Sequence, residues 1–584
     1  MRYTPPIKNL SLLIAFCVCC SAASAQNFER YRPITPQAPA VQSPNLSTPQ
    51  QAVSGSDRQL LESLDAVIVL DNADAVQPQN ANEDAVGLIR QIHDRDSLVQ
   101  SAAFSRIIHR YLGQPVSLRS LNQMSFDIIQ MYRRHKRPIV DVLIPEQKIT
   151  GGTVQIVVIE SRIGRVAVQD GCYTDACDLK KWVQCTRPGG RIYEPWIEND
   201  LFWLNQNPFR RVTVDLRPGA VDGTTDVIFE TRDVRPIRGY IGYDDTGVQS
   251  LNRERLLAGV ILGDPFGHDG ILSYQYTGDG ALHRLHAHAV SYNLPIDRCR
   301  SFQAYGSWAG VTPALGGGLT QEGESWQAGL ALVRHLHKSR WGSTNLSAGF
   351  DFKSTNNNLE FGGTNVSASE ADLVQLRIGI DSFERRCCDE YTRARGDVYV
   401  GPGDGFTSNH NRASFNTIRP GTSPDYVYGR VSFEDATNID ADNRWQLVSR
   451  AVGQASSERL LFSETLGFGG FDSVRGYDQR TLSGDHGWLA SFELGPRPRN
   501  LCIRDRQARL RYYSFIDMGD SYIADPLPGE NANQFLWSSG VGMQLSVGQD
   551  VSLRMDYGFG FEDVAGLPND RLHLGLIWQF GPRP

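Results

Sequence analysis

Residues 571–580 read "RLHLGLIWQF", and apolar side chains occupy every second position of this stretch. Residues 551–561, "VSLRMDYGFGF", alternate in the same way, with Ser552, Arg554 and Asp556 on the other face. Successive side chains of a β-strand point to opposite faces, so each stretch predicts a strand with one apolar and one polar face. The apolar face of the first stretch consists of Leu572, Leu574, Leu576, Trp578 and Phe580.

This alternation continues through the chain from about residue 235, in short segments separated by Gly, Asp, Asn and Pro. A soluble sandwich would have to bury these aromatic-rich faces, and the region shows no helical periodicity that could cover them. Strands that are apolar outside and polar inside are typical of a membrane barrel with a water-filled lumen. Roughly 350 residues, at roughly 22 per strand and loop, give about 16 strands. We therefore predict a transmembrane antiparallel β-barrel over residues 235–584.

The N-terminal residues predict export of the chain. Arg2 and Lys8 precede the apolar run "LSLLIAFCVCC", and "ASA" at 23–25 precedes a predicted cleavage site before Gln26. We predict a signal peptide at 1–25 and a Pro/Gln/Ser-rich N-terminal segment and linker at 26–60. After residue 26 no apolar run is long enough for a membrane helix. The formal net charge of -7 gives no reason to expect nucleic acid as a partner.

The cysteines are compatible with an oxidising compartment. Three of the 10 cysteines lie in the predicted signal peptide, so an odd number is exported and at least one thiol stays unpaired if disulfides form. The clustered Cys172, Cys177 and Cys185 lack the C-x-x-C spacing of a zinc site. The pairing stays open among Cys172, Cys177, Cys185, Cys299, Cys387, Cys388 and Cys502.

Two small units precede the barrel, at 61–161 and 162–234, and both read strand, helix, helix, strand, strand. In the first unit, "LDAVIVL" predicts a strand, the helical periodicity of 97–113 ends at Gly113, and a second helix is closed by Pro138. Two strands follow, "IVDVLIP" and "TVQIVVIE". Tandem copies of one topology indicate a recognition arm rather than an enzyme core.

Four motifs follow one another in a fixed order along the chain. They are "LNQNPFRRVTVDLRPGAVDGTTDVIFET", "RPIRGYIGYDDTGVQS", "SVRGY" (473–477) and "FIDMGD" (515–520). In this order they resemble the outer-membrane transporters of two-partner secretion (the TpsB family of ShlB/FhaC/HecB-like haemolysin secretion/activation proteins). The resemblance covers nearly all of the exported chain. It implies that the two small units are periplasmic β-α-α-β-β POTRA domains, that the barrel lies in the bacterial outer membrane, and that a loop around 465–485 folds into it.

In that family the loop arginine contacts a strand aspartate inside the lumen, which implies a pair of Arg475 with Asp517. The alternation of "QARLRYYSFID" independently places Asp517 on the polar, lumenal face. Glu493, on the polar face of "WLASFEL", is a competing partner, and a solvated external position of Arg475 is an alternative. The predicted loop-tip and lumen contacts are Val474, Arg475, Gly476, Tyr477, Phe515, Asp517 and Gly519.

The resemblance further implies a pore that recognises an unfolded exported partner through its POTRA domains and translocates it to the cell surface without nucleotide hydrolysis. The implied partners are a large secreted β-helical exoprotein of adhesin or haemolysin type, outer-membrane lipid, and the barrel-assembly machinery during biogenesis. The candidate cargo contacts are Leu201, Leu204, Val212 and Val214, although such stripes are also typical of a core. The alternative functions are an outer-membrane protein assembly insertase and a passive solute porin or receptor.

Other signals are weaker. G-x-S-x-G, G-x-x-x-x-G-K-[ST] and H-E-x-x-H are absent from the sequence, so we predict no enzyme, no cofactor and no metal site. His286 and His288 share a strand face without a third ligand and are predicted as lumenal polar residues. The Arg-Gly-Asp tripeptide at 395–397 lies inside an alternating segment, so adhesion through it is not expected. Whether the N-terminal segment forms a plug helix stays open.

Overall fold

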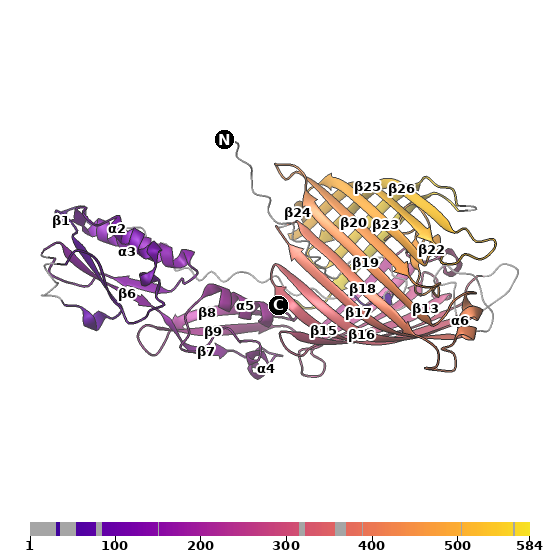
Figure 1. The fold of residues 1–584 in the computed structure, drawn as a ribbon, viewed down its shortest axis with the longest axis horizontal. Coiled ribbons are helices and arrows are strands. Elements are labelled where there is room, and N and C mark those ends of the chain that lie inside the picture. The colour runs from indigo at the N-terminus through magenta and orange to yellow at the C-terminus, as the bar shows by residue number, and fades with distance from the viewer. Residues whose placement is uncertain are drawn as a thin grey trace. The chain divides into compact units, whose positions relative to one another are not determined.

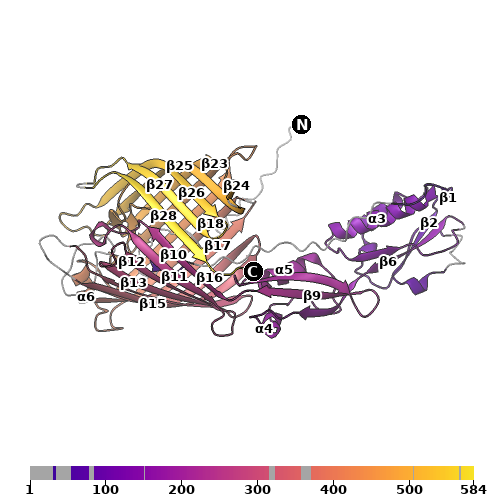
Figure 2. The same cartoon turned by 180° about the vertical axis from the view of Figure 1, so that it is seen from behind.

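The computed structural model describes residues 31–34, 54–77, 85–149, 151–314, 322–356, 370–387, 389–503, 505–564 and 567–584. The chain divides into two compact units (Figures 1 and 2). The barrel unit contains Arg235–Pro582 and residues 31–34, and the N-terminal unit lies within Ala38–Val234. The predicted signal peptide and most of the Pro/Gln/Ser-rich segment lie outside the described residues. Among the described helices, none is both long and apolar enough to cross a membrane.

The first domain of the N-terminal unit is a four-stranded sheet, in the order β3-β2-β6-β5, packed against two helices. One core contains the fully buried Phe104, Met124 and Ile128 of the two helices together with Val67 and Val154 of the sheet. The elements are β1 (Gln59–Leu61), β2 (Ala66–Leu70), η1 (Ala73–Ala75), β3 (Gly87–Gln91), η2 (Leu98–Gln100), α2 (Ala102–His109), β4 (Val116–Ser117), α3 (Leu118–Arg134), β5 (Val140–Leu143) and β6 (Thr153–Glu160).

Two features of this domain were not predicted from the sequence. β3 is an extra edge strand, parallel to β2, and the short strands β1 and β4 pair with each other. None of the residues of β3 is buried, whereas all five residues of β2 are. An edge strand without a buried face carries no alternation of apolar and polar residues, which is why the pattern of "GLIRQ" did not reveal it.

The second domain has the predicted order of strand, helix, helix, strand, strand. Its elements are β7 (Arg162–Val168), α4 (Ala176–Lys180), α5 (Glu194–Leu204), β8 (Arg210–Pro218) and β9 (Thr224–Asp233), and its sheet has the order β7-β9-β8. Asp200 of α5 is fully buried and accepts hydrogen bonds from the backbone N–H groups of Gln184, Cys185 and Thr186. These bonds hold the segment between the two helices against α5.

Asp94 of the first domain binds two arginines of the second. Its carboxylate lies 2.7 Å from Arg162 and 2.7 Å from Arg191. Burial raises the pKa of this carboxyl, but the backbone hydrogen bond from Asp96 and the charge of Arg191 outweigh burial, so that the pKa is lowered. The ionised form of Asp94 therefore stabilises the junction between the two domains.

We expect Asp94→Asn to loosen this junction by about 1 kcal/mol, the value of a half-exposed charge network. The folded pKa lies below the unfolded value of about 3.9, so the stabilisation is complete above that pH and is lost as pH falls through the folded pKa. The measurement is hydrogen exchange of the backbone amide of Arg191, corrected for intrinsic rates. Its protection should decrease as the pH falls in the wild type, and should change less with pH in the variant. Asp96→Asn is the control, since the Asp96 side chain is 88% exposed and 3.9 Å from Arg191. An equal loss of protection in Asp94→Asn and Asp96→Asn would contradict the role of Asp94 at the junction.

The barrel is closed and antiparallel, as predicted, and has 16 strands in the described chain when β23 and β24 are taken as one interrupted strand, since both pair with β25. The first strand pairs with the last, from Gly239 opposite Phe580 to Asp244 opposite Gly575. The barrel strands are β10 (Ile237–Asp244), β11 (Arg255–Gly263), β12 (Ile271–Asp279), β13 (Leu285–Pro295), β14 (Arg300–Val311), β15 (Gly323–Ser339), β16 (Gly342–Thr355), β17 (Ala371–Arg385), β18 (Tyr391–Pro402), β19 (Asp425–Asn438), β20 (Trp445–Ser456), β23 (His486–Pro496), β24 (Arg499–Ile503), β25 (Arg506–Tyr522), β26 (Asn533–Val547), β27 (Val551–Gly560) and β28 (Asp570–Phe580). Two further short elements lie in the connections, η3 (Gln249–Leu251) and α6 (Arg412–Ile418).

The two faces of the barrel wall differ as the alternation predicts. On β28, Leu572 is 53% and Trp578 51% exposed on the outer surface. Facing the lumen, Asp556 of β27 and His573 of β28 are buried. The outer face thus presents apolar side chains to lipid, and the inner face collects the polar ones.

His286 and His288 lie on the outer face, so their prediction as lumenal residues is wrong. Between them, Ala287 is fully buried and belongs to an inner cluster with Tyr31. The Nδ1 atom of His286 lies 2.8 Å from the hydroxyl of Tyr276, whose ring also lies 5.3 Å from that of His288. Tyr31 packs against the lumenal face of this strand, where the side chains are small. The polar side chains of the strand therefore face outward, the reverse of the usual pattern in a barrel.

The Arg-Gly-Asp tripeptide is built into β18. Asp397 is buried and binds Arg377 at 2.8 Å and Arg395. It is therefore not displayed for adhesion. Of the described cysteines, Cys172, Cys177, Cys299, Cys387 and Cys502 have free, exposed thiols in this structure. The last three lie on separate barrel hairpins.

Candidate functional site: the inward loop of the barrel

The connection between β20 and β23, residues 457–485, folds into the lumen, and we call it the inward loop. It contains a two-stranded ribbon of β21 (Leu466–Phe468) and β22 (Leu482–Gly484). Beyond the ribbon, the tip is buried, with Val474, Arg475 and Tyr477 at most 2% exposed. Phe468, Val474 and Tyr477 pack with Leu489 and Leu536 of the wall. An arginine can be buried at this depth only if its charge is matched.

Asp517 of β25 balances the charge of Arg475. The Nε of Arg475 donates to Oδ2 at 2.7 Å and Nη2 donates to Oδ1 at 2.7 Å, which is a bidentate pair. The backbone N–H of Arg475 donates to the same Oδ2 at 3.1 Å. The guanidinium carbon lies 3.6 Å from the centre of the Phe515 ring, a cation–π contact. Arg475, Asp517 and Phe515, three of the residues selected from the sequence, thus meet at one point.

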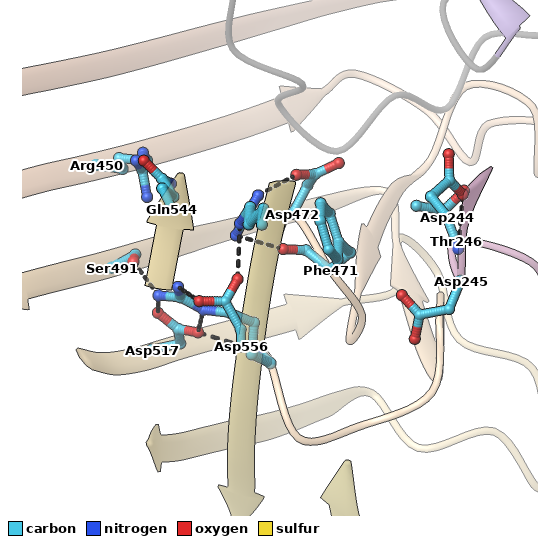
Figure 3. A network of polar contacts seen from close by, with 12 residues as sticks. Asp244, Asp245, Thr246, Arg450, Phe471, Asp472, Ser491, Asp517, Gln544 and Asp556 are labelled. Atoms are coloured by element: carbon cyan, nitrogen blue, oxygen red, sulfur yellow. Dashed lines mark hydrogen bonds and ion pairs between the residues drawn. The ribbon is translucent and has the colours of Figure 1, made fainter. Parts of the chain in front are cut away.

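Two further carboxylates complete the site, and Figure 3 shows one of them, Asp556, beside Asp517. Nη1 of Arg475 donates to Glu493 at 2.9 Å and to Asp556 at 3.3 Å. The sequence left Asp517 and Glu493 as competing partners, and the structure uses both. Asp556 was recognised only as a polar-face residue of its strand, because alternation gives the face of a residue and not its partner.

The carboxylates are in turn shared with arginines of the wall. Glu493 binds Arg450 and Arg511, each at 2.6 Å. Asp556 binds Arg554 at 2.6 Å, and Arg554 also reaches back to Asp472 of the loop at 3.0 Å. Positive and negative groups therefore alternate through the network, so removing one charge leaves its neighbours unbalanced.

Glycines bring the loop backbone against the wall. Gly476 has φ +96°, a conformation that favours glycine, and a Cβ there would lie 2.9 Å from the backbone carbon of Gly558. A Cβ on Gly558 of β27 would lie 2.7 Å from the nitrogen of Gly476. A Cβ on Gly519 would lie 2.9 Å from the ring of Phe468 in β21. Gly519 and Gly558 thus leave the space into which the loop fits.

On its other side the tip contacts the seam between β10 and β28. The N–H of Gly476 donates to Nε2 of His573 at 3.3 Å, and Nδ1 of His573 lies 3.2 Å from Asp245. Asp478 binds Arg571 of β28, which also donates to Asp245 at 3.1 Å. Asp245, in the motif that follows β10, accepts the N–H of Leu574 at 3.1 Å where the strand pairing ends. No sequence pattern indicated these contacts.

A cavity of about 350 Å³ lies beside the tip. Its arginine lining comprises Arg32, Arg393, Arg395, Arg450, Arg475 and Arg554. Arg32 belongs to the described N-terminal residues, which lie in the lumen: Gln275 donates to the carbonyl of Tyr31 at 3.2 Å, and the N–H of Ile34 donates to the hydroxyl of Tyr240 at 3.1 Å. The segment before Tyr31 lies outside the described residues, so whether it forms a plug helix stays an open question.

The side chains selected as cargo contacts do not form a surface. Leu201, Leu204 and Val212 are buried in the core of the second domain, and Val214 packs against that core. Their prediction as cargo-binding side chains is corrected accordingly, because the helical and strand stripes that selected them are the stripes that close the core.

Residues 223–545, more than half of the chain, match the family described as haemolysin secretion/activation protein ShlB/FhaC/HecB. The chain belongs to this family. Residues 88–161 match the POTRA domain of ShlB type. The predicted family, the barrel with POTRA domains and the outer-membrane location are thereby confirmed. The protein is a two-partner secretion transporter of the outer membrane with periplasmic POTRA domains.

Curated relatives agree with this assignment. The chain is 20% identical to the outer membrane transporter CdiB of Dickeya dadantii over 544 residues, covering 89% of this chain and 90% of that protein. It is 22% identical to the heme/hemopexin transporter protein HuxB of Haemophilus influenzae over 425 residues, covering 69% and 71%. Members of the family are transporters that act with secreted exoproteins.

Solved structures share the fold. CdiB from Escherichia coli superposes with a TM-score of 0.60 at 18% identity, covering 92% of this chain and 94% of that chain. BamA from Haemophilus ducreyi lacking POTRA domains 1–3 gives a TM-score of 0.56 at 13% identity, covering 83% and 98%. At these identities the likeness extends to the fold alone.

Proposed function

We propose that this transporter recognises one unfolded exoprotein through its POTRA domains and passes it outward through the barrel, with the inward loop as the gate. The observation that carries the gating role is the buried Arg475, which is held by Asp517, Glu493 and Asp556 of the wall. A loop fixed in the lumen only by non-covalent contacts can leave it and return. The cargo we propose is a large β-helical adhesin or haemolysin whose folding outside draws the extended chain through.

For the POTRA contact we propose strand addition at an open sheet edge. Because the side chains predicted to contact the cargo belong to the core of the second domain, we propose that the backbone of this domain binds the cargo instead. Among the described residues, β8 (Arg210–Pro218) pairs with β9 on one side only. On its other side Asn205 bonds both backbone groups of Val212, so the edge proposed for strand addition begins after Val212. An extended polypeptide adding there would gain main-chain hydrogen bonds without a fixed sequence.

The test is a gene deletion followed by comparison of the culture medium with the outer-membrane fraction. Loss of one large exoprotein from the medium, restored by the wild-type gene, is the expected result. Broad depletion of barrel proteins would instead support an assembly insertase. Unchanged proteins with altered solute uptake would support a porin or receptor.

A further inference from the structure

Two further buried ion pairs hold the inward loop near the wall. One joins Asp485, at the end of the loop, to Arg419 at 2.6 Å, and the other involves Glu464. Glu464, at the start of the loop and fully buried, lies 2.7 Å from Nζ of Lys353, which is 4% exposed on β16. Its second oxygen accepts the hydroxyl of Tyr428 of β19 at 2.7 Å. Ser463 and Gln375 also donate to this carboxylate, at 3.0 and 3.4 Å.

The ion pairs of Glu464 and Arg475 attach the loop to different parts of the wall. Glu464 contacts β16, β17 and β19 through Lys353, Gln375 and Tyr428. Arg475 contacts β23, β25 and β27. We define residues 460–468 with 482–485, which include the β21–β22 ribbon, as the root, and residues 471–479 as the tip. The loop is therefore attached at both its root and its tip.

Root and tip differ in their surroundings. Arg475 and Asp472 of the tip line the cavity of about 350 Å³, whereas neither Lys353 nor Glu464 is among its described lining residues. Between root and tip lie Gly469 and Gly470, with φ +96° and +108°. These two glycines occupy backbone conformations that other residues adopt only under strain, and they allow the chain to bend between the two parts.

We infer that the Lys353–Glu464 pair is a fixed anchor about which the tip moves during transport. The tip leaves its seat against β27 into the adjoining space, while the root stays bound to β16 and β19. Lys353 is thus a positioning residue, which acts by setting where the tip returns. This inference rests on the gating role proposed above.

The first test compares single and paired neutral variants. Lys353→Met leaves the Glu464 carboxylate buried without its cation, so secretion should fall at least about ten-fold, and single-channel conductance without cargo should become unstable. Lys353→Met combined with Glu464→Gln removes both charges, but the amide oxygen can still accept the Tyr428 hydroxyl, so the root stays attached in a neutral form and both readouts should return to within about three-fold of the wild type. An unaffected single variant, or a paired variant as defective as the single one, would overturn the anchor. Heat-modifiable mobility of the barrel controls for folding.

The second test asks whether the root moves. Lys353→Cys and Glu464→Cys, in a background whose exposed native cysteines are serine, are joined by a reducible bifunctional thiosulfonate. Secretion should be the same before and after reduction if the root is fixed. Secretion that is blocked by the cross-link and recovered by reductant would overturn the inference. Failure of the gating role itself is distinguishable, because Arg475→Ala would then secrete normally in the same assay.

Discussion

Arg475→Ala is expected to abolish secretion while the barrel remains folded in the outer membrane. The substitution leaves Asp517, Glu493 and Asp556, all fully buried, without their central cation. Removing one partner of a buried ion pair costs about 3–5 kcal/mol, chiefly because the remaining charge is uncompensated. The other polar contacts of the tip, of Asp472 with Arg554 and of Asp478 with Arg571, remain but do not replace the cation beside Asp517, so the seated position of the loop is no longer favoured.

Secretion of the partner into the medium is the readout, with barrel abundance and heat-modifiable mobility as controls for insertion. Arg475→Lys is the matched variant. It keeps the charge but lacks the planar fork that binds both oxygens of Asp517, so we expect partial activity. Normal secretion by Arg475→Ala at normal abundance would remove Arg475 from the gate.

The three carboxylates also determine the effect of exchanging the charges of Arg475 and Asp517. Arg475→Asp with Asp517→Arg would recover activity if the site were a simple pair. In the structure the introduced carboxylate would lie beside Glu493 and Asp556, the other two acceptors of Arg475. We therefore expect the exchanged variant to recover much less than Arg475→Lys, and recovery to wild-type secretion would contradict the three-carboxylate site.

The barrel itself was predictable because lipid imposes a two-residue period on every strand. The outer face of β28 and the lumenal position of Asp517 both follow from that period. The same rule failed at His286 and His288, where small residues face inward and polar ones face outward. Periodicity identifies two faces, and only what fills the lumen decides which of them is inside.

The depth of the site was not predictable. A pair in a wet lumen would be worth about 1 kcal/mol, but Arg475 is 2% exposed and lies in the regime of buried charges. Asp556 and His573 are 81 and 97 residues from the loop residues they contact. Contacts of that span depend on strand register and barrel closure, which local sequence patterns do not encode.

The other large effect is expected from a single methyl group. Gly558→Ala would place a Cβ 2.7 Å from the nitrogen of Gly476 and 2.9 Å from the carbonyl carbon of Arg475. Both atoms are backbone and cannot rotate away, so the tip has to shift. Overpacking of this kind costs roughly 1–3 kcal/mol. That range corresponds to roughly a 5- to 150-fold change in the population of the seated loop.

We therefore expect Gly558→Ala to reduce secretion and to raise the frequency of open events in planar bilayers, with normal insertion. Gly429→Ala in β19 is the control, because a Cβ there meets only the carbonyl oxygen of Asp397, at 3.8 Å. If both alanines behave alike, β strand propensity rather than loop seating explains the result. If Gly558→Ala alone opens the channel, the gate depends on close contact between the loop backbone and the wall, in addition to the charge of Arg475.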